Sequence, residues 1–293
     1  MPVKDSKKST AAAFSAQREF PFAPGDFRRV RDLIAKFAGI ALADHKENMV
    51  YNRLARRLRS TGIGSFGEYL DMVEQPDSEE RGQFVNALTT NLTSFFREGH
   101  HFEILAEYAA ARRRATPGGG RLRVWSSACS TGEEPYSAAI VLREAECPAE
   151  IVATDIDTEV LRRAQRGNYA LESVDNMNQE RLRRYFLKGV GQNEGRIMVR
   201  PELQAMVRFS QCNLQGNNWP TGDRFDVIFC RNVMIYFSRE SQRQVLERFI
   251  GVLRPGGLLF VGHSESYATG HAALRNCGKT AYERRADDSP RAS

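Results

Sequence analysis

Glu133 and Glu134 stand directly after a turn of small residues, 126–132 (SSACSTG), and two adjacent carboxylates there can bind a cation. Residues 126–137 contain no Lys or Arg, whereas a phosphate cradle requires positive charge, so a P-loop is a poor interpretation. A ligand with an amine or sulfonium group fits better, which favours S-adenosylmethionine over ATP or NAD. An ordinary turn between a strand and a helix explains the same residues about equally well.

The residues around this turn predict a strand before it and a helix after it. Leu122, Val124 and Trp125 have side chains typical of a buried strand. Pro135 suits the first turn of a helix, where its missing N–H is not needed. Such a unit presents backbone N–H groups at the carboxyl edge of a parallel sheet, where nucleotide-like ligands bind.

Three further apolar runs end in polar residues, and each predicts another strand. Residues 150–154 end at Asp155, where a second parallel strand would place an acid beside a ribose. Asp157 or Thr158 could cap the following helix, with Gly167 as its stop, and Asp155 could equally be only a helix-entry residue. The other two runs are residues 207–212, before Asn213 and Leu214, and residues 225–230, before Arg231 and Asn232.

Five long motifs follow one another along the chain: TTNLTSFFRE (89–98), ACSTGEEPYS (128–137), ATDIDTEVL (153–161), CRNVMIYF (230–237) and LLFVGHSES (258–266). In this order they resemble the chemotaxis receptor methyltransferase family, CheR, and the resemblance runs from about residue 20 to residue 284. It implies transfer of a methyl group from S-adenosyl-L-methionine to glutamate side chains of membrane chemoreceptors. The products would be glutamate γ-methyl esters and S-adenosyl-L-homocysteine.

The implied fold is an α/β, Rossmann-like methyltransferase with a doubly wound sheet, an all-helical N-terminal domain and an inserted small antiparallel β-subdomain. Helical periodicity before a Pro-Gly-Gly-Gly break, followed by alternating strands and helices, agrees with this order. A short helix is expected at 179–187 and an exposed strand at 196–200. We expect disordered tails at 1–19 and 287–293, a receptor-docking domain at 20–95, a linking helix and linker at 96–120, and the methyltransferase domain at 121–286, with the β-subdomain at 168–206.

The resemblance also assigns roles to residues near the predicted crevice. The cofactor-binding positions would be Asn91, Thr93, Arg97, Glu133, Glu134, Asp155, Asn213, Leu214, Arg231, Asn232 and Val233. Tyr236 and Arg97 would be catalytic, although Tyr236 could instead be an aromatic core residue. A glutamate carboxylate is already ionised at neutral pH, so this chemistry needs alignment of the substrate and no general base. Phe95 and Phe96 are expected in the core.

Two regions are expected to bind the receptor. Lys46, Arg53, Arg56 and Arg57 share one face of a predicted helix, with Arg59 at its border, and no acid lies on that face. The resemblance places this face against the acidic methylation helices of the receptor, although arginine runs are usually solvated surfaces. Gly189, Gly195 and Arg196 of the β-subdomain would hold a C-terminal tethering peptide of the receptor, with Met198 where the family has a charge; a decorated loop is the simpler interpretation.

Composition limits the remaining possibilities. The 293 residues carry a net charge of +6 and a pI of about 9.2, which suits an acidic partner. Two rival functions are a nucleic-acid methyltransferase and a non-catalytic S-adenosylmethionine-binding module. The segment NVMI (232–235) disfavours the first, because it lacks a base-stacking aromatic residue. Five scattered cysteines predict buried thiols, and His100 next to His101 predicts no metal site. We expect a cytoplasmic monomer, with no nucleic acid bound and no membrane insertion.

Overall fold

The computed structural model describes residues 18–115 and 120–286. The described residues therefore exclude the tail expected at 287–293 and nearly all of the tail expected at 1–19. They also exclude most of the end of the linker expected at 96–120. The chain divides into two compact units, residues 1–89 and 90–293. The boundary follows Thr89 and not residue 95, so the TNLTSFFRE segment belongs to the second unit.

The first unit is helical, as the periodicity predicts. Its elements are α2 (Pro24–Ala38), η2 (Asp44–Lys46), α3 (Glu47–Thr61), α4 (Phe66–Glu74) and α5 (Glu80–Leu88). Gly39 and Gly62 end α2 and α3 in the left-handed conformation, with φ of 69° and 72°, which glycine adopts at little cost. Val30, Val50 and Leu54 are fully buried, because the apolar stripes of these helices face a common core.

The second unit is built on a seven-stranded sheet with the order β6-β2-β1-β7-β8-β10-β9. The strands are β1 (Leu122–Ser126), β2 (Ala149–Asp155), β6 (Val207–Gln211), β7 (Phe225–Cys230), β8 (Leu253–Val261), β9 (Leu274–Gly278) and β10 (Ala281–Arg284). The first five in space are parallel, β10 pairs antiparallel with β8, and β9 pairs antiparallel with β10. All four strands expected before residue 231 are therefore present, at nearly the expected bounds.

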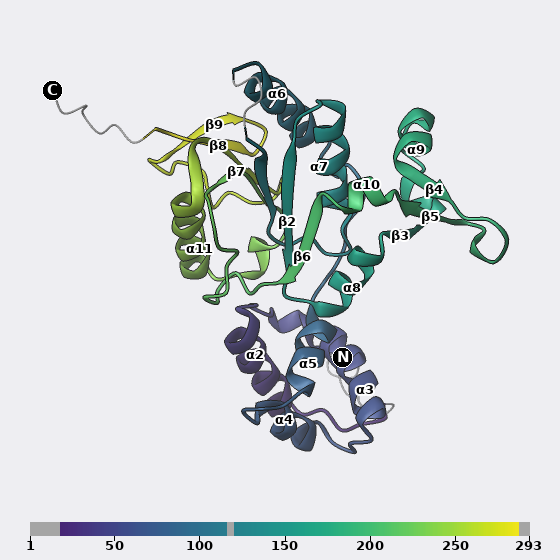
Figure 1. The fold of residues 1–293 in the computed structure, drawn as a ribbon. Coiled ribbons are helices and arrows are strands. Elements are labelled where there is room, and N and C mark those ends of the chain that lie inside the picture. The colour runs from purple at the N-terminus through teal and green to yellow at the C-terminus, as the bar shows by residue number, and fades with distance from the viewer. Residues whose placement is uncertain (1–17, 116–119, 287–293) are drawn as a thin grey trace, which may run out of the picture. The chain divides into compact units, whose positions relative to one another are not determined.

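Helices cover both faces of this sheet (Figure 1). The helices are α6 (His100–Ala115), α7 (Glu133–Glu144), α8 (Thr158–Arg166) and α11 (Arg239–Val252). Residues of α6, α7 and α8 pack in one buried cluster with Val124, whereas α11 packs in another with the neighbouring Trp125. Successive residues of β1 thus serve opposite layers, as the two-residue period of a strand requires.

The strand order reverses at β1, whose neighbours are β2 on one side and β7 on the other. In open parallel sheets, a crevice forms at the carboxyl ends of the strands where the order reverses. The turn after β1, Asp155 at the end of β2, and Arg231 and Asn232 after β7 all lie at this edge. The fold therefore brings together the polar strand ends that the sequence predicts.

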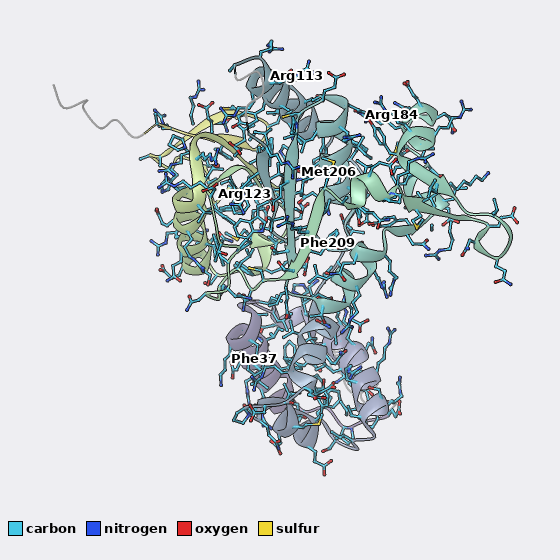
Figure 2. All side chains as sticks on the ribbon, in the orientation of Figure 1. Phe37, Arg113, Arg123, Arg184, Met206 and Phe209 are labelled. Atoms are coloured by element: carbon cyan, nitrogen blue, oxygen red, sulfur yellow. The ribbon has the colours of Figure 1, made fainter. Side chains whose placement is uncertain are left out.

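The segment between α8 and β6 contains a separate antiparallel sheet with the order β3-β5-β4. Its elements are β3 (Asn168–Ala170), η3 (Leu171–Val174), α9 (Gln179–Tyr185), β4 (Phe186–Lys188), η4 (Gly191–Asn193), β5 (Arg196–Val199) and α10 (Pro201–Gln204). Figure 2 shows Arg184 on α9 in this part of the unit and Phe209 on the adjoining β6 of the main sheet.

Two expectations about this segment need correction. The helix expected at 179–187 ends at Tyr185, because the next three residues pair with β5 as strand β4. The strand at 196–199 alternates exposed and buried side chains, as expected, but it is the centre of the sheet and not an edge, because β3, which the sequence pattern did not indicate, pairs with its other side. Open edges belong to β3 and β4.

Candidate active site

Four non-glycine residues at the predicted crevice have positive φ: Phe96 (53°), Glu98 (56°), Ser130 (48°) and Asn232 (57°). Their segments are joined by hydrogen bonds, from Ser130 Oγ to the Asn91 carbonyl at 3.3 Å and from Asn232 Nδ2 to Glu98 Oε1 at 3.3 Å. Strained backbone of this kind persists where the surroundings hold it and is concentrated at functional sites.

Asp155 ends β2 with a buried side chain. Its Oδ2 accepts a hydrogen bond from the Ser130 N–H at 2.8 Å, and its Oδ1 accepts one from the Asp157 N–H at 3.0 Å. Burial raises the pKa of Asp155 to about 6, and these backbone donors oppose the rise. The carboxylate is thus anchored to the turn after β1 and retains acceptor capacity for a ligand hydroxyl.

The turn after β1 packs tightly against the rest of the fold. At Gly132, whose φ is 99°, an added Cβ would lie 2.8 Å from both Ala164 Cβ and the Tyr169 hydroxyl, so only glycine fits. The acids that follow differ in their partners. Glu133 accepts a hydrogen bond from Thr131 Oγ1 at 2.7 Å, and burial raises its pKa.

Both carboxylate oxygens of Glu134 accept hydrogen bonds from other side chains. Its Oε1 accepts a hydrogen bond from Ser126 Oγ at 2.7 Å, and its Oε2 accepts one from Arg231 Nη1 at 3.0 Å. The Arg231 side chain is 2% exposed, and its Nη2 lies 3.5 Å from Glu98 Oε2 and also donates to the carbonyl of Arg97. Arg231, expected to bind the cofactor, is therefore engaged with two protein carboxylates.

The segment after Thr89 lies beside the same strand ends. Asn91 Nδ2 donates to Asp157 Oδ2 at 2.8 Å, while Asp157 Oδ1 caps α8. Thr93 is half-buried, and Arg97 Nη1 donates to the Leu92 carbonyl at 2.7 Å. Phe95 and Phe96, expected in the core, pack against the buried cluster around α6 and α7.

The turn after β7 is held by an acid to which the sequence reasoning gave no role. Glu265 is buried, and its Oε2 accepts from the Asn232 N–H at 2.8 Å while its Oε1 accepts from the Val233 N–H at 3.0 Å. Glu98 likewise received no role. Both acids lie within quoted motifs, and the available signal was, for Glu265, an acid among small polar residues just after a strand.

Tyr236 lies at the end of η5 (Met234–Tyr236) and is half-buried. Its ring packs against the cluster around α11, so the aromatic-core interpretation is correct for part of the side chain. No hydrogen bond of its hydroxyl occurs within residues 18–115 and 120–286. Its neighbour Ile235 is 51% exposed.

Asn213 and Leu214 follow β6 and differ in environment. Asn213 is half-buried, and its Oδ1 accepts a hydrogen bond from the Gln215 N–H at 3.0 Å. The side chain of Leu214 is buried in the cluster that contains Trp219, and its carbonyl accepts from Trp219 Nε1 at 3.0 Å. If this loop flanks an adenine, Asn213 is the more accessible of the two.

Helical geometry does not keep the two adjacent histidines apart, contrary to the expectation from the sequence. His100 and His101 are adjacent at the start of α6, yet their Nε2 atoms lie 3.0 and 3.1 Å from the Lys279 carbonyl, and with Glu98 they form a group spanning 4.8 Å. Arg231 beside Glu98 places a positive charge next to any cation there. This repulsion disfavours a divalent ion.

Comparison with known proteins agrees with this geometry. Residues 91–282 match the model described as "CheR methyltransferase, SAM binding domain", and residues 25–89 match "CheR methyltransferase, all-alpha domain". The chain belongs to the CheR family.

Curated relatives in the family are similar over most of their length. The "Chemotaxis protein methyltransferase" of Salmonella typhimurium is 48% identical over 93% of this chain and 94% of its own, and that of Escherichia coli is 49% identical over 87% and 89%. "Chemotaxis protein methyltransferase 2" of Pseudomonas aeruginosa is 46% identical over 94% and 98%. The protein is an S-adenosylmethionine-dependent methyltransferase of chemotaxis, and the nucleic-acid alternative is not favoured.

The residues at the crevice suit S-adenosylmethionine. Glu133 and Asp155 are buried acids that no Lys or Arg pairs with among the described residues. A cationic group of the ligand would compensate Glu133, and Asp155 can accept hydrogen bonds from ligand hydroxyls. Arg97 has no carboxylate partner among the described residues, and a carboxylate of the ligand would supply one. The match to a binding domain for this cofactor therefore agrees with the donors and acceptors present.

The basic face of α3 is less self-repelling than the sequence indicated. Arg57 donates from Nε and Nη2 to the two carboxylate oxygens of Glu80 on α5, both at 2.7 Å, and Arg59 donates to Glu19 at 2.9 Å. Arg53 Nη1 donates to the Thr89 carbonyl at 2.5 Å. Lys46 and Arg56 are exposed and pair with no acid of the described residues.

The β-subdomain of this CheR protein places charge beside Met198. Arg196 and Met198 are both exposed on one face of β5, and Arg196 Nε donates to Asn168 Oδ1 at 2.8 Å. In the loop between β4 and β5, Gly195 has a φ of 77°, and an added Cβ at Gly189 would lie 2.0 Å from the Asn193 carbonyl oxygen. Both glycines are required by the loop geometry.

Cysteine and hydropathy features complete the description. Cys129, Cys147, Cys212 and Cys230 are free buried thiols, as expected, whereas Cys277 is exposed on an edge strand. In residues 18–115 and 120–286, no helix is long and apolar enough to cross a membrane.

Proposed function

We propose that this protein transfers a methyl group from S-adenosylmethionine to glutamate side chains of membrane chemoreceptors, forming γ-methyl esters. The family resemblance supports glutamate as the acceptor. The site requires no general base, because the acceptor carboxylate is already a nucleophile at neutral pH.

The observation that carries the proposal is the contrast between two arginines. Arg231 is buried and compensated by Glu134 and Glu98, whereas Arg97, whose backbone carbonyl bonds to Arg231, pairs with no acid in the described residues. Its guanidinium is thus available to a carboxylate from outside the protein. That carboxylate belongs to the cofactor, the substrate glutamate, or each in turn.

The residues then have distinct tasks. Bound S-adenosylmethionine supplies an electrophilic methyl group on a sulfonium. Glu133, whose charge no arginine compensates, is the better of the two acids for an ammonium group, because Glu134 is paired with Arg231. Asp155 accepts hydrogen bonds from the ribose hydroxyls, and the Tyr236 hydroxyl orients the substrate carboxylate. The rate enhancement would come from desolvation and alignment.

Receptor docking would use two surfaces. Two exposed cations, Lys46 at the end of η2 and Arg56 on α3, suit an acidic helix. An open edge of the β3-β5-β4 sheet offers backbone N–H and C=O groups to an extended tail peptide. A tethered tail would raise the local concentration of methylation sites to roughly millimolar. We propose a monomer as the active form.

Methyl transfer from tritiated cofactor to receptor membranes, DNA and RNA tests the proposal. We expect label only in the membranes, released as methanol by mild alkali, because carboxylate esters are alkali-labile. A receptor with glutamine at the methylation positions should accept no label. Alkali-stable label, or label in nucleic acid, would contradict the proposal.

Tyr236→Phe tests the proposed role of the hydroxyl. Since no hydrogen bond of that hydroxyl occurs in the described residues, stability and S-adenosylhomocysteine affinity should not change. The kcat should fall about 10- to 100-fold through loss of alignment. An unchanged kcat would assign Tyr236 to the core alone.

A further inference from the structure

Glu265 lies in the loop after β8, within the GHSES part of a motif that the proposed mechanism leaves without a role. The residue is 5% exposed. Its carboxylate accepts five backbone N–H bonds: at Oε1 from Val233 (3.0 Å), Met234 (2.7 Å) and Ile235 (3.3 Å), and at Oε2 from Asn232 (2.8 Å) and Gly262 (2.7 Å).

Four of these N–H groups are consecutive and belong to the turn that carries Asn232 and leads to Tyr236. Asn232 has a φ of 57°, and a left-handed residue in such a turn directs successive N–H groups towards one anion. Val233, the residue that precedes η5, makes no side-chain capping bond to it. Glu265 therefore serves as a distant cap for this turn.

The contact is close enough to constrain the neighbouring chain. A Cβ added at Gly262 would lie 2.5 Å from Asn232 Nδ2, 2.7 Å from Asn232 N and 2.7 Å from Glu265 Oε2. On its other side the turn is held by Glu98, whose Oε1 accepts from Asn232 Nδ2. The backbone of residues 232–235 is thus fixed by two carboxylates from different segments.

We propose that Glu265 is a positioning residue for methyl transfer: its carboxylate fixes the 232–235 backbone and thereby the placement of Asn232 and Tyr236. The inference rests on the proposed function of Tyr236. Glu265 is separated from Tyr236 by this turn and acts through it. Misplacement of a reacting group by about 1 Å can lower a rate about 100-fold.

Glu265→Gln is a size-matched test. Both oxygens of the carboxylate accept N–H bonds, whereas a glutamine amide has one oxygen and one NH2 group. In either orientation, the NH2 group would face at least two backbone N–H donors. Asp226→Asn is the control, because Asp226 is also buried, at 2% exposure, and accepts the Arg123 N–H at 2.9 Å near the opposite end of β7.

The experiment compares amide hydrogen exchange, S-adenosylhomocysteine binding and receptor methylation in the full-length proteins. For Glu265→Gln we expect exchange at residues 232–235 and 262 to rise about tenfold or more, with kcat about 10- to 100-fold lower and the KM for receptor unchanged. Asp226→Asn should alter neither exchange at those amides nor kcat. Gly262→Ala, which disturbs the same contact and keeps the carboxylate, should reproduce both effects if Glu265→Gln does not fold.

Several results would overturn the positioning role: unchanged exchange at 232–235, faster exchange with an unchanged kcat, or the same effects in Asp226→Asn. Exchange and S-adenosylhomocysteine binding need no receptor. An error in the proposed substrate would appear instead as absent receptor methylation by the wild-type protein.

Discussion

Arg231 and Glu134 form an ion pair beneath the candidate active site, with Nη1 of the arginine 3.0 Å from Oε2 of the glutamate. The arginine side chain is 2% exposed, and the glutamate side chain is 12% exposed. The pair connects the turn after β7 with the first turn of α7, so it joins two of the strand ends that form the crevice. Its contribution is primarily to keep each buried charge compensated.

Removal of Arg231 should therefore be costly. Arg231→Met leaves Glu134 and Glu98 buried without their cation, and unfolding by denaturant should show a loss of about 3–5 kcal/mol. Arg162→Met provides the control, because Arg162 pairs with Glu159 at exposed positions, where an ion pair contributes about 0–1 kcal/mol. Equal losses of unfolding free energy in the two variants would show that the buried ion pair stabilises the protein no more than an exposed one.

Cofactor binding should depend on the protonation of Asp155. Burial raises the pKa of Asp155 to about 6, and hydrogen bonds from ribose hydroxyls would favour the ionised form and lower that pKa in the complex. Affinity for S-adenosylhomocysteine should therefore be highest above pH 6 and fall as the pH is lowered through about 6. Calorimetry at several pH values on both sides of 6 measures this change in affinity.

The Asp155→Asn variant separates this effect from general acid sensitivity. It should bind S-adenosylhomocysteine about 1–3 kcal/mol more weakly at neutral pH, and its affinity should vary less with pH near 6. Asp226 is also a buried carboxylate, near the opposite end of β7, and Asp226→Asn should retain the wild-type dependence of affinity on pH. A wild-type profile in Asp155→Asn would place the ribose elsewhere.

The partners of the α3 cations change how receptor docking should be tested. Arg56→Glu reverses an exposed cation without a partner among the described residues, so it should reduce receptor methylation and leave stability and cofactor affinity intact. The wild-type rate should also fall as salt rises, because exposed charges are screened beyond about 8–10 Å at physiological ionic strength.

Arg28→Glu on α2 is a matched control for Arg56→Glu, since Arg28 is also exposed in the first unit. It should leave methylation unchanged. Arg53→Glu and Arg57→Glu are poorer tests, because they break bonds to the Thr89 carbonyl and to Glu80. Normal methylation by Arg56→Glu would make the basic face only a solvated surface.

The loop between β4 and β5 offers a test of the tethering peptide. Gly189→Val would force a side chain to within 2.0 Å of the Asn193 carbonyl oxygen, and the loop should distort. We expect weaker binding of a receptor tail peptide and a higher apparent KM for tailed receptors, with an unchanged kcat for receptors lacking the tail. Gly191→Ala is a milder control in the same loop, because an added Cβ meets no atom within 4 Å and only the positive φ of 59° disfavours alanine there.

Much of the fold could be predicted from local sequence. The helices of the first unit follow apolar spacing and end at Gly39 and Gly62, and the strands ending at Asp155 and Cys230 follow short apolar runs. These signals are local, because a side chain's burial within one element depends on its period. The short strands β3 and β4 carry no such signal, since only pairing with β5 makes three residues a strand.

The family, and the acids that gather at the carboxyl edge of the sheet, could be predicted from the chain alone, because motif order and strand ends are properties of local sequence. How those charges are compensated became visible in the folded molecule. Glu80 reaches Arg57 from another helix, Glu134 is paired with Arg231 across 97 positions of sequence, and Glu265 caps a turn more than 30 positions away. Electrostatic pairing depends on distance in space, and no periodicity along the chain encodes it.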